Sequence, residues 1–139
     1  MSRFEGVDFY EIDDLLTDDE VDVRDVVRSW VDDNVLPIIE DHYHAGTFPN
    51  ELAKQMGELG FLGANLRGYG CPGLNNVCYG LICQELERGD SAIRSFASVQ
   101  GSLVMFPIHA YGSEEQKNKW LPRLAAGEDR TVFLCRVVL

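Results

Sequence analysis

The front of the chain carries an amphipathic helix with a recognisable start. Thr17-Asp18-Asp19-Glu20 matches a capping box, in which the threonine and glutamate side chains bond each other's backbone N–H groups. After it, apolar residues recur at the helical period of about 3.6 and share one face. These residues are Val23, Val26, Val27, Trp30, Val31 and Val35. Pro37 should kink this helix or restart it, because proline has no N–H to donate.

Four further helices are indicated, so the chain reads as all-α. Capping residues, glycines and apolar periodicity set their expected spans at residues 48–60, 75–89, 91–110 and 113–127. The helix over 91–110 is apolar around most of its circumference, and we expect it to be the most buried element. Together these helices predict a bundle of about five helices around one core. Residues 130–139 read instead as a short strand-like stub without a pairing strand.

Composition and charge exclude several classes of partner. Hydrophobic residues make up 45% of the 139 residues, and no apolar run is long enough to span a membrane. The net charge of −11 argues against nucleic acid, which is bound through clustered lysines and arginines. Most of the acidic residues lie near the front of the chain. We interpret this acidic run as a solvated face, with a docking site for a partner as the alternative.

The cysteines, histidines and glycines give only weak evidence for a metal, catalytic or nucleotide-binding site. The four cysteines lack the spacing of a zinc site and fit a reducing cytoplasm, so no metal is expected. His42, His44 and His109 have no visible catalytic partner, and we expect them to cap helices or face solvent. The segment 68–73 fits the pattern G-x-G-x-x-G, but the strands of a dinucleotide-binding unit are missing around it. A tight loop between helices is favoured over a phosphate cradle.

The most informative polar residues lie on the apolar helix expected over 91–110. Ser91, Arg94, Ser95, Ser98 and Ser102 fall within a sector of roughly 100°. The plainer interpretation is that small serines permit close packing and bond back to helix carbonyls. Arg94 argues against it, because a guanidinium on a buried helix is costly unless an anion pairs with it. That anion is either Glu87 or a substrate carboxylate, which Arg94 would hold with support from Ser95 and Ser98.

A set of short segments between about Phe9 and Phe133 carries a family resemblance. The most specific are Met56-Gly57-Glu58-Leu59-Gly60, Gly68-Tyr69-Gly70-Cys71, Tyr79-Gly80, Glu85-Leu86-Glu87-Arg88, Asp90-Ser91, Arg94-Ser95, Ser98-Val99-Gln100 and Tyr111-Gly112-Ser113-Glu114-Glu115-Gln116. In these segments the chain resembles the N-terminal helical domain of the acyl-CoA dehydrogenases, and most closely that of the glutaryl-CoA dehydrogenases. The pair of Arg94 and Ser98 points to a dicarboxylic substrate.

The resemblance implies a fold, a cofactor and a chemistry. Enzymes of this family have a helical domain, a middle β domain and a C-terminal helical bundle, bind FAD between the last two, and are usually homotetramers. The resemblance implies that Arg94, Ser95 and Ser98, with Glu87 close by, surround the distal carboxylate of glutaryl-CoA. In the full enzyme a carboxylate base removes an α-proton, a β-hydride passes to flavin, and decarboxylation gives crotonyl-CoA.

The resemblance also divides the chain and marks where it departs from the family. The parts are an N-terminal extension (1–16), the helical domain (17–128) and a truncated or divergent start of a β domain (129–139). After Phe133 the family continues into Thr-Glu-Pro and Gly-Ser-Asp segments, and neither follows here. We therefore expect a truncated, frame-shifted or split product that has no catalytic base, binds no FAD alone and is inactive alone. The alternatives are a dehydrogenase for another acyl-CoA and a stand-alone helical interaction module.

Overall fold

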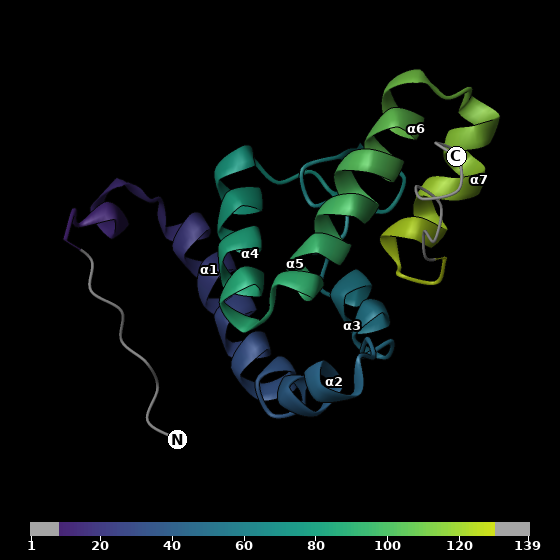
Figure 1. The fold of residues 1–139 in the computed structure, drawn as a ribbon. Helices are drawn as coiled ribbons and strands as arrows, with labels where there is room; N and C mark the ends of the chain where they lie inside the picture. The colour runs from purple at the N-terminus through teal and green to yellow at the C-terminus, as the bar shows by residue number, and fades with distance from the viewer. Residues whose placement is uncertain (1–8, 130–139) are drawn as a thin grey trace.

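The structure, a computed structural model, describes residues 9–129, and these residues are almost entirely helical (Figure 1). The helical elements are η1 (Ile12–Leu15), α1 (Asp18–Trp30), η2 (Val31–Val35), α2 (Ile39–Ala45), α3 (Leu52–Glu58), α4 (Asn76–Gly89), α5 (Ser91–Ser98), η3 (Val99–Met105), α6 (Phe106–Tyr111) and α7 (Glu114–Ala125). A short hairpin pairs β1 (Arg67–Gly68) with β2 (Cys71–Pro72). The all-α prediction is confirmed for this part of the chain. The strand predicted over 130–139 lies outside it.

Helix α1 begins at the predicted capping box. The hydroxyl of Thr17 accepts from the backbone N–H of Glu20 at 3.4 Å, and a Glu20 carboxylate oxygen accepts from the backbone N–H of Thr17 at 2.9 Å. The other oxygen of Glu20 accepts from the side-chain amide of Asn75 at 2.8 Å. Asn75 is itself the N-cap of α4. One buried carboxylate therefore ties together the first turns of α1 and α4.

Pro37 separates the first helix from a second one, as predicted. The π-helical η2 continues α1, and α2 restarts the chain after the proline. The sequence predicted this restart without bounds for α2, and Gly46 ends the helix in the left-handed conformation, with φ 63°. The helix predicted over 48–60 is shorter, because α3 begins only at Leu52, after the turn that contains Pro49.

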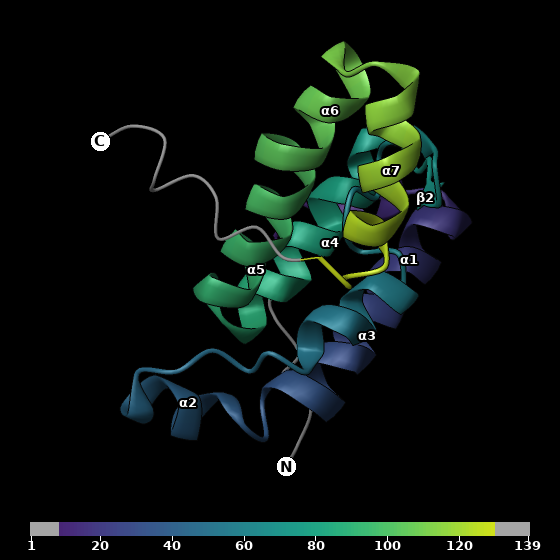
Figure 2. The same ribbon diagram turned by 90° about the vertical axis from the view of Figure 1, so that its right-hand side faces the viewer.

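Helices α1 and α4 lie side by side and carry the centre of the core (Figure 1 and Figure 2). Fully buried side chains come from both helices, for example Val27 and Leu86, and from α5 with Ile93. Trp30 meets the ring of Phe61 edge-on, with ring centroids 5.5 Å apart. Each such side chain contributes about 1.5–3 kcal/mol when it leaves water, so these faces hold the helices together.

The helix predicted over 91–110 is present, but the prediction that it is the most buried element is wrong. It consists of α5, the π-helical η3 and α6, which follow one another as a continuous rod (Figure 1). Leu103 and Phe106 on this rod are 55% and 50% exposed. Apolar residues around most of the helix therefore do not make it buried on every side. Because Pro107 has no N–H to donate back along the helix, the wider π-helical turns before it relieve the clash expected in a regular α-helix.

Helix α7 is fixed at both of its ends. It begins at the predicted capping box of Ser113 and Gln116, in which each side chain bonds the other's backbone N–H group. Near its other end, the buried amide of Gln100 donates to the carbonyl of Leu124 at 3.1 Å and to that of Asp129 at 2.8 Å. These contacts tie η3 to α7.

The glycine motif at residues 68–73 forms a tight hairpin. The Cα partners across it are Arg67 with Pro72 and Gly68 with Cys71. Tyr69 at the tip has φ 54°, a left-handed conformation that is uncommon for a residue with a side chain. Its hydroxyl donates to Glu114 at 2.7 Å, which holds the tip against α7. The predicted tight loop is confirmed, and the hairpin lacks the strand–loop–helix geometry of a dinucleotide cradle.

Candidate functional site

Most of the residues selected from the sequence lie together where α4 faces α5, with Ser95 taking part through its backbone carbonyl, whereas Ser102 lies further along on η3. Arg94 Nε donates to Glu87 Oε2 at 2.6 Å, and Arg94 Nη1 donates to Ser98 Oγ at 3.3 Å. Ser98 in turn donates to the backbone carbonyl of Ser95 at 3.1 Å. Ser91 donates to the other carboxylate oxygen of Glu87. We call these five residues the Arg94 cluster.

The side chain of Arg94 is not buried, which contradicts the prediction that it lies on a buried face. Its exposed fraction is 37%, and that of Glu87 is 44%. The buried face of α5 is instead the one that carries Ile93 and Ala97. Of the two anions considered, Glu87 is the one that pairs with Arg94, and Ser98 also bonds back to its own helix. A role for the Arg94 cluster in substrate binding therefore requires Arg94 to bind a second anion in addition to Glu87.

Arg94 keeps hydrogen-bonding capacity for a second anion. A guanidinium has five N–H donors, and within residues 9–129 Arg94 uses one on Nε and one on Nη1. The hydrogen bond with Glu87 raises the pKa of Arg94, and the same bond lowers the pKa of the Glu87 carboxyl. Both groups therefore stay charged near neutral pH. Glu87 orients the guanidinium from the Nε side and leaves the Nη groups available to a planar carboxylate.

Two residues that continue the cluster along α4 were missed in the sequence. Tyr79 Oη lies 3.1 Å from Ser102 Oγ, so a second polar contact joins α4 to the facing rod. Cys83 lies between Tyr79 and Glu87 at helical spacing, and burial raises the pKa of its thiol. The spacing of four residues from Tyr79 to Cys83 and from Cys83 to Glu87 indicates this in the sequence, because residues four apart share one face of a helix.

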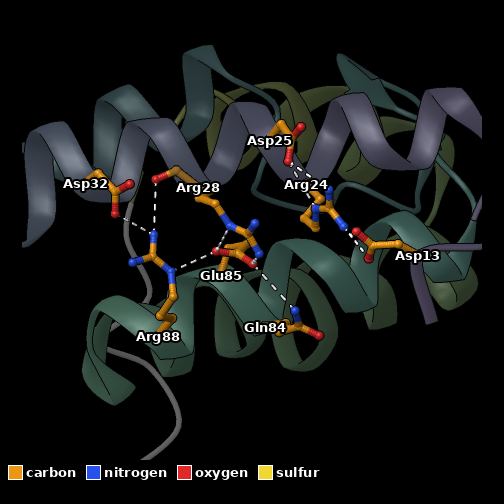
Figure 3. A network of polar contacts seen from close by, with 8 residues as sticks. All are labelled: Asp13, Arg24, Asp25, Arg28, Asp32, Gln84, Glu85 and Arg88. Atoms are coloured by element: carbon orange, nitrogen blue, oxygen red, sulfur yellow. Dashed lines mark hydrogen bonds and ion pairs between the residues drawn. The ribbon is translucent and has the colours of Figure 1, made fainter. Parts of the chain in front are cut away.

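A second charged cluster, centred on Glu85, joins α4 to α1 (Figure 3). Glu85 is 1% exposed, and Arg28 donates to both of its carboxylate oxygens, at 2.7 and 3.1 Å. Arg88 donates to Glu85 at 2.8 Å and to Asp32 at 2.7 Å. Burial by itself would raise the pKa of Glu85, but the hydrogen bonds from the two arginines outweigh it and the pKa is lowered. We call these four residues the Glu85 clamp, since each charge in it is compensated by a neighbour.

Arg24 forms a separate bridge at the start of α1 (Figure 3). Its guanidinium contacts Asp13 on η1 and Asp25 on its own helix. The hydrogen bond with Asp13 raises the pKa of Arg24. This bridge holds η1 against α1 and, like the Glu85 clamp, is structural.

The three histidines make contacts away from the Arg94 cluster. His42 Nδ1 lies 2.8 Å from the Thr47 hydroxyl, and His109 Nε2 lies 2.9 Å from the carbonyl of Arg67. His42 also borders a cavity of about 180 Å³ between the α2–α3 connection and the start of α5. The exposed His44 agrees with the predicted solvent-facing role, whereas His109 does not cap a helix and instead joins α6 to β1.

The described part of the chain shows neither a metal cluster nor a dinucleotide cradle. Within residues 9–129, no three His, Cys, Asp or Glu side chains are grouped so that they could hold a metal. The glycine motif in the same range is a hairpin between β1 and β2. Over the same range, no helix combines the length and apolar character needed to cross a membrane.

Solved structures share this fold. A glutaryl-CoA dehydrogenase from Mycobacterium smegmatis, in complex with FADH2, is 57% identical with a TM-score of 0.86, over 87% of this chain and 31% of that one. Butyryl-CoA dehydrogenase from Megasphaera elsdenii is 28% identical with a TM-score of 0.76, over 89% of this chain and 32% of that one. An acyl-CoA dehydrogenase from Bacillus anthracis, 30% identical with a TM-score of 0.76 over 89% of this chain and 22% of that one, is complexed with FAD.

Sequence comparison leads to the same family. The family model described as the acyl-CoA dehydrogenase N-terminal domain matches residues 17–128. An acyl-CoA dehydrogenase of Bacillus subtilis is 34% identical over 119 residues, which are 85% of this chain and 31% of the relative. The chain thus spans about a third of the length of such relatives. The resemblance found in the sequence is confirmed, and the chain belongs to the acyl-CoA dehydrogenase family, with residues 17–128 as its N-terminal domain.

Proposed function

We propose that this domain provides the acyl-binding wall of an FAD-dependent glutaryl-CoA dehydrogenase. Arg94 receives the distal carboxylate of glutaryl-CoA, and Ser95 and Ser98 line the same surface. The observation that carries the proposal is the oriented guanidinium, which Glu87 holds at 2.6 Å while the arginine side chain stays 37% exposed. The 57% identity with a glutaryl-CoA dehydrogenase, against 28% with a butyryl-CoA dehydrogenase, supports the same acyl group.

The role assigned to residues 9–129 is binding and orientation. The whole enzyme would oxidise and decarboxylate glutaryl-CoA to crotonyl-CoA, and would assemble as the homotetramer expected of the family. We assign no step of the oxidation to this part of the chain, whose polar contacts support carboxylate binding at Arg94 and the packing of α4 on α1. A second domain that covers Arg94 would strengthen its hold on the carboxylate, since charge interactions grow when water is excluded.

The proposal is tested with the chain itself and two small probes. Monomethyl glutarate has one free carboxylate, and its ester stands in for the thioester, whereas methyl valerate has the same length without the carboxylate. In an NMR titration, monomethyl glutarate should shift the Arg94 Nε–H signal saturably, and methyl valerate should not. Arg94→Lys should bind about tenfold more weakly, because lysine lacks the planar pair of donors. Arg123→Lys is the matched control, since Arg123 is exposed and pairs with Asp129.

Each result of this titration decides between the candidates. Unchanged affinity in Arg94→Lys and Arg94→Ala, or no saturable shift in the unmodified chain, rejects the carboxylate site. Equal affinity for methyl valerate favours a dehydrogenase for another acyl-CoA. Selective binding of monomethyl glutarate that depends on Arg94 supports the glutaryl assignment.

A stand-alone interaction module has one observation in its favour. Leu103, Phe106 and Trp120 are exposed at 55%, 50% and 39%, on η3, α6 and α7. Apolar side chains grouped on a surface are typical of protein interfaces. Sedimentation velocity tests this function: self-association that Leu103→Glu abolishes would favour it, and a monomer that binds no hydrophobic dye would count against it.

A further inference from the structure

Tyr79 extends the Arg94 cluster by one more contact between the same two elements. On α4, Tyr79 and Glu87 lie on the same side of the helix, because they are eight residues apart and differ by a rotation of only about 80°. The facing rod meets them with Ser102 and Arg94 respectively, at 3.1 Å and 2.6 Å. The two contacts lie eight residues apart on each element, and Ser98, which accepts from Arg94, lies halfway between them on the rod.

The Tyr79 hydroxyl has the properties of a hydrogen-bond donor to an anion. Burial raises the pKa of Tyr79, although the hydrogen bond with Ser102 and the positive charge of Arg94 act in the opposite direction. The phenol is therefore protonated at neutral pH. Two hydroxyl groups bring two O–H donors, and the contact between Tyr79 and Ser102 uses one of them. The Cys83 thiol is a second hydrogen-bond neighbour of the phenol, and a carboxylate is a stronger acceptor than either a hydroxyl or a thiol.

A carboxylate bound to Arg94 can accept more hydrogen bonds than the guanidinium donates to it. Its two oxygens offer about four lone-pair sites, and a bidentate contact with an arginine fills about two of them. We propose that Tyr79 donates a hydrogen bond to the same carboxylate that Arg94 binds, and that Ser102 holds the phenol in place for it. The inference rests on the proposed function and adds a further binding residue, specific for a terminal carboxylate, on α4.

The experiment compares Tyr79→Phe with the unmodified chain, using the monomethyl glutarate titration. Phenylalanine keeps the ring and removes only the hydroxyl, so affinity should fall about tenfold, the usual effect of one hydrogen bond to a charged group. Affinity should fall less in Ser102→Ala, which leaves the phenol in place without its anchor. Tyr43→Phe is the matched control, because Tyr43 is 78% exposed on α2.

A second measurement does not depend on any variant. In the unmodified chain, nuclear Overhauser effects should connect the methylene protons of bound monomethyl glutarate to the ring protons of Tyr79. Their absence at saturation, or full affinity in a folded Tyr79→Phe variant, overturns the inference. If Arg94→Ala weakens binding but Tyr79→Phe does not, only the role of Tyr79 is wrong. If Arg94→Ala has no effect either, the proposed function has failed and the inference fails with it.

Discussion

Replacing Glu85 by glutamine should destabilise the protein, because it removes the one negative charge that two arginines share. Glu85 is 1% exposed and accepts three hydrogen bonds from Arg28 and Arg88. Glutamine keeps the shape and one acceptor oxygen, but it places an amide N–H₂ group where an arginine N–H now points. The variant leaves two guanidinium groups without their common partner at the interface of α1 and α4.

The size of the effect follows from how well water can replace the lost partner. Removing one member of a fully buried ion pair costs about 3–5 kcal/mol. Here the arginine side chains are 34% and 28% exposed, so water compensates part of the loss. We expect Glu85→Gln to lower the free energy of unfolding by about 2 kcal/mol, which corresponds to a fall in Tm of roughly 6 °C for a chain of this size.

Urea unfolding at several pH values provides the assay, and the sign of the pH dependence is fixed by the lowered pKa of Glu85. A carboxyl whose pKa is lower in the folded state stabilises the fold above its unfolded-state pKa. That stabilisation is lost as the pH falls through the folded-state pKa. The difference between the unmodified chain and Glu85→Gln should therefore be constant from pH 7 to about pH 5 and shrink at lower pH.

Two results would refute this reasoning. One is an unfolding free energy for Glu85→Gln within about 0.5 kcal/mol of the unmodified chain at pH 7, the range of ordinary surface substitutions. The other is a difference that grows as the pH falls. Glu58→Gln is the control, because Glu58 is 63% exposed and pairs with Lys54 at 3.8 Å. It should leave the unfolding midpoint nearly unchanged.

Three further substitutions, at one helix cap and two glycines, can be tested by thermal or urea unfolding. Asp90→Ala should cost about 1 kcal/mol, because the Asp90 carboxylate caps α5 by accepting from two backbone N–H groups at 2.8 and 3.3 Å; Asp90→Asn should retain most of that stability. Gly127→Ala should cost more than about 2 kcal/mol, since its Cβ would lie 2.2 Å from the carbonyl oxygen of Ala53 at a φ of +69°. Gly80→Ala, with nothing within 4 Å of its Cβ, should instead stabilise α4 by about 0.5–1 kcal/mol. Equal effects at the two glycines would contradict this account.

The ends of helices could be predicted from the sequence because caps are local. Thr17, Asp90 and Ser113 each bond to backbone groups only two or three residues away, so sequence neighbours alone decide whether the cap forms. The family resemblance likewise rests on short segments that can be read directly. Element type and helix starts therefore agree between sequence and structure over most of the described range.

Burial could not be predicted in the same way, because it depends on which neighbours the fold supplies. The rod from α5 to α6 is apolar on several faces, yet Leu103 and Phe106 stay exposed because only one side of the rod packs on this domain. Arg94 was placed on a buried helix, and its side chain is 37% exposed. The Glu85 clamp was missed for the same reason, since the sequence does not show which glutamate of α4 faces α1.

The two glutamates of α4 show how the fold separates stability from binding. Glu85 and Glu87 are two residues apart and so point to nearly opposite sides of the helix, about 160° apart. Glu85 fixes α4 on α1, and from that fixed helix Glu87 orients Arg94 on α5. We expect the orientation of Arg94 to depend on the Glu85 clamp but not the reverse. Loosening α4 would move Glu87, whereas removing the charge of Glu87 would leave the clamp intact. Glu87→Gln should therefore change carboxylate binding at nearly unchanged stability, and a matched loss of both would mean that the two faces of α4 are not independent.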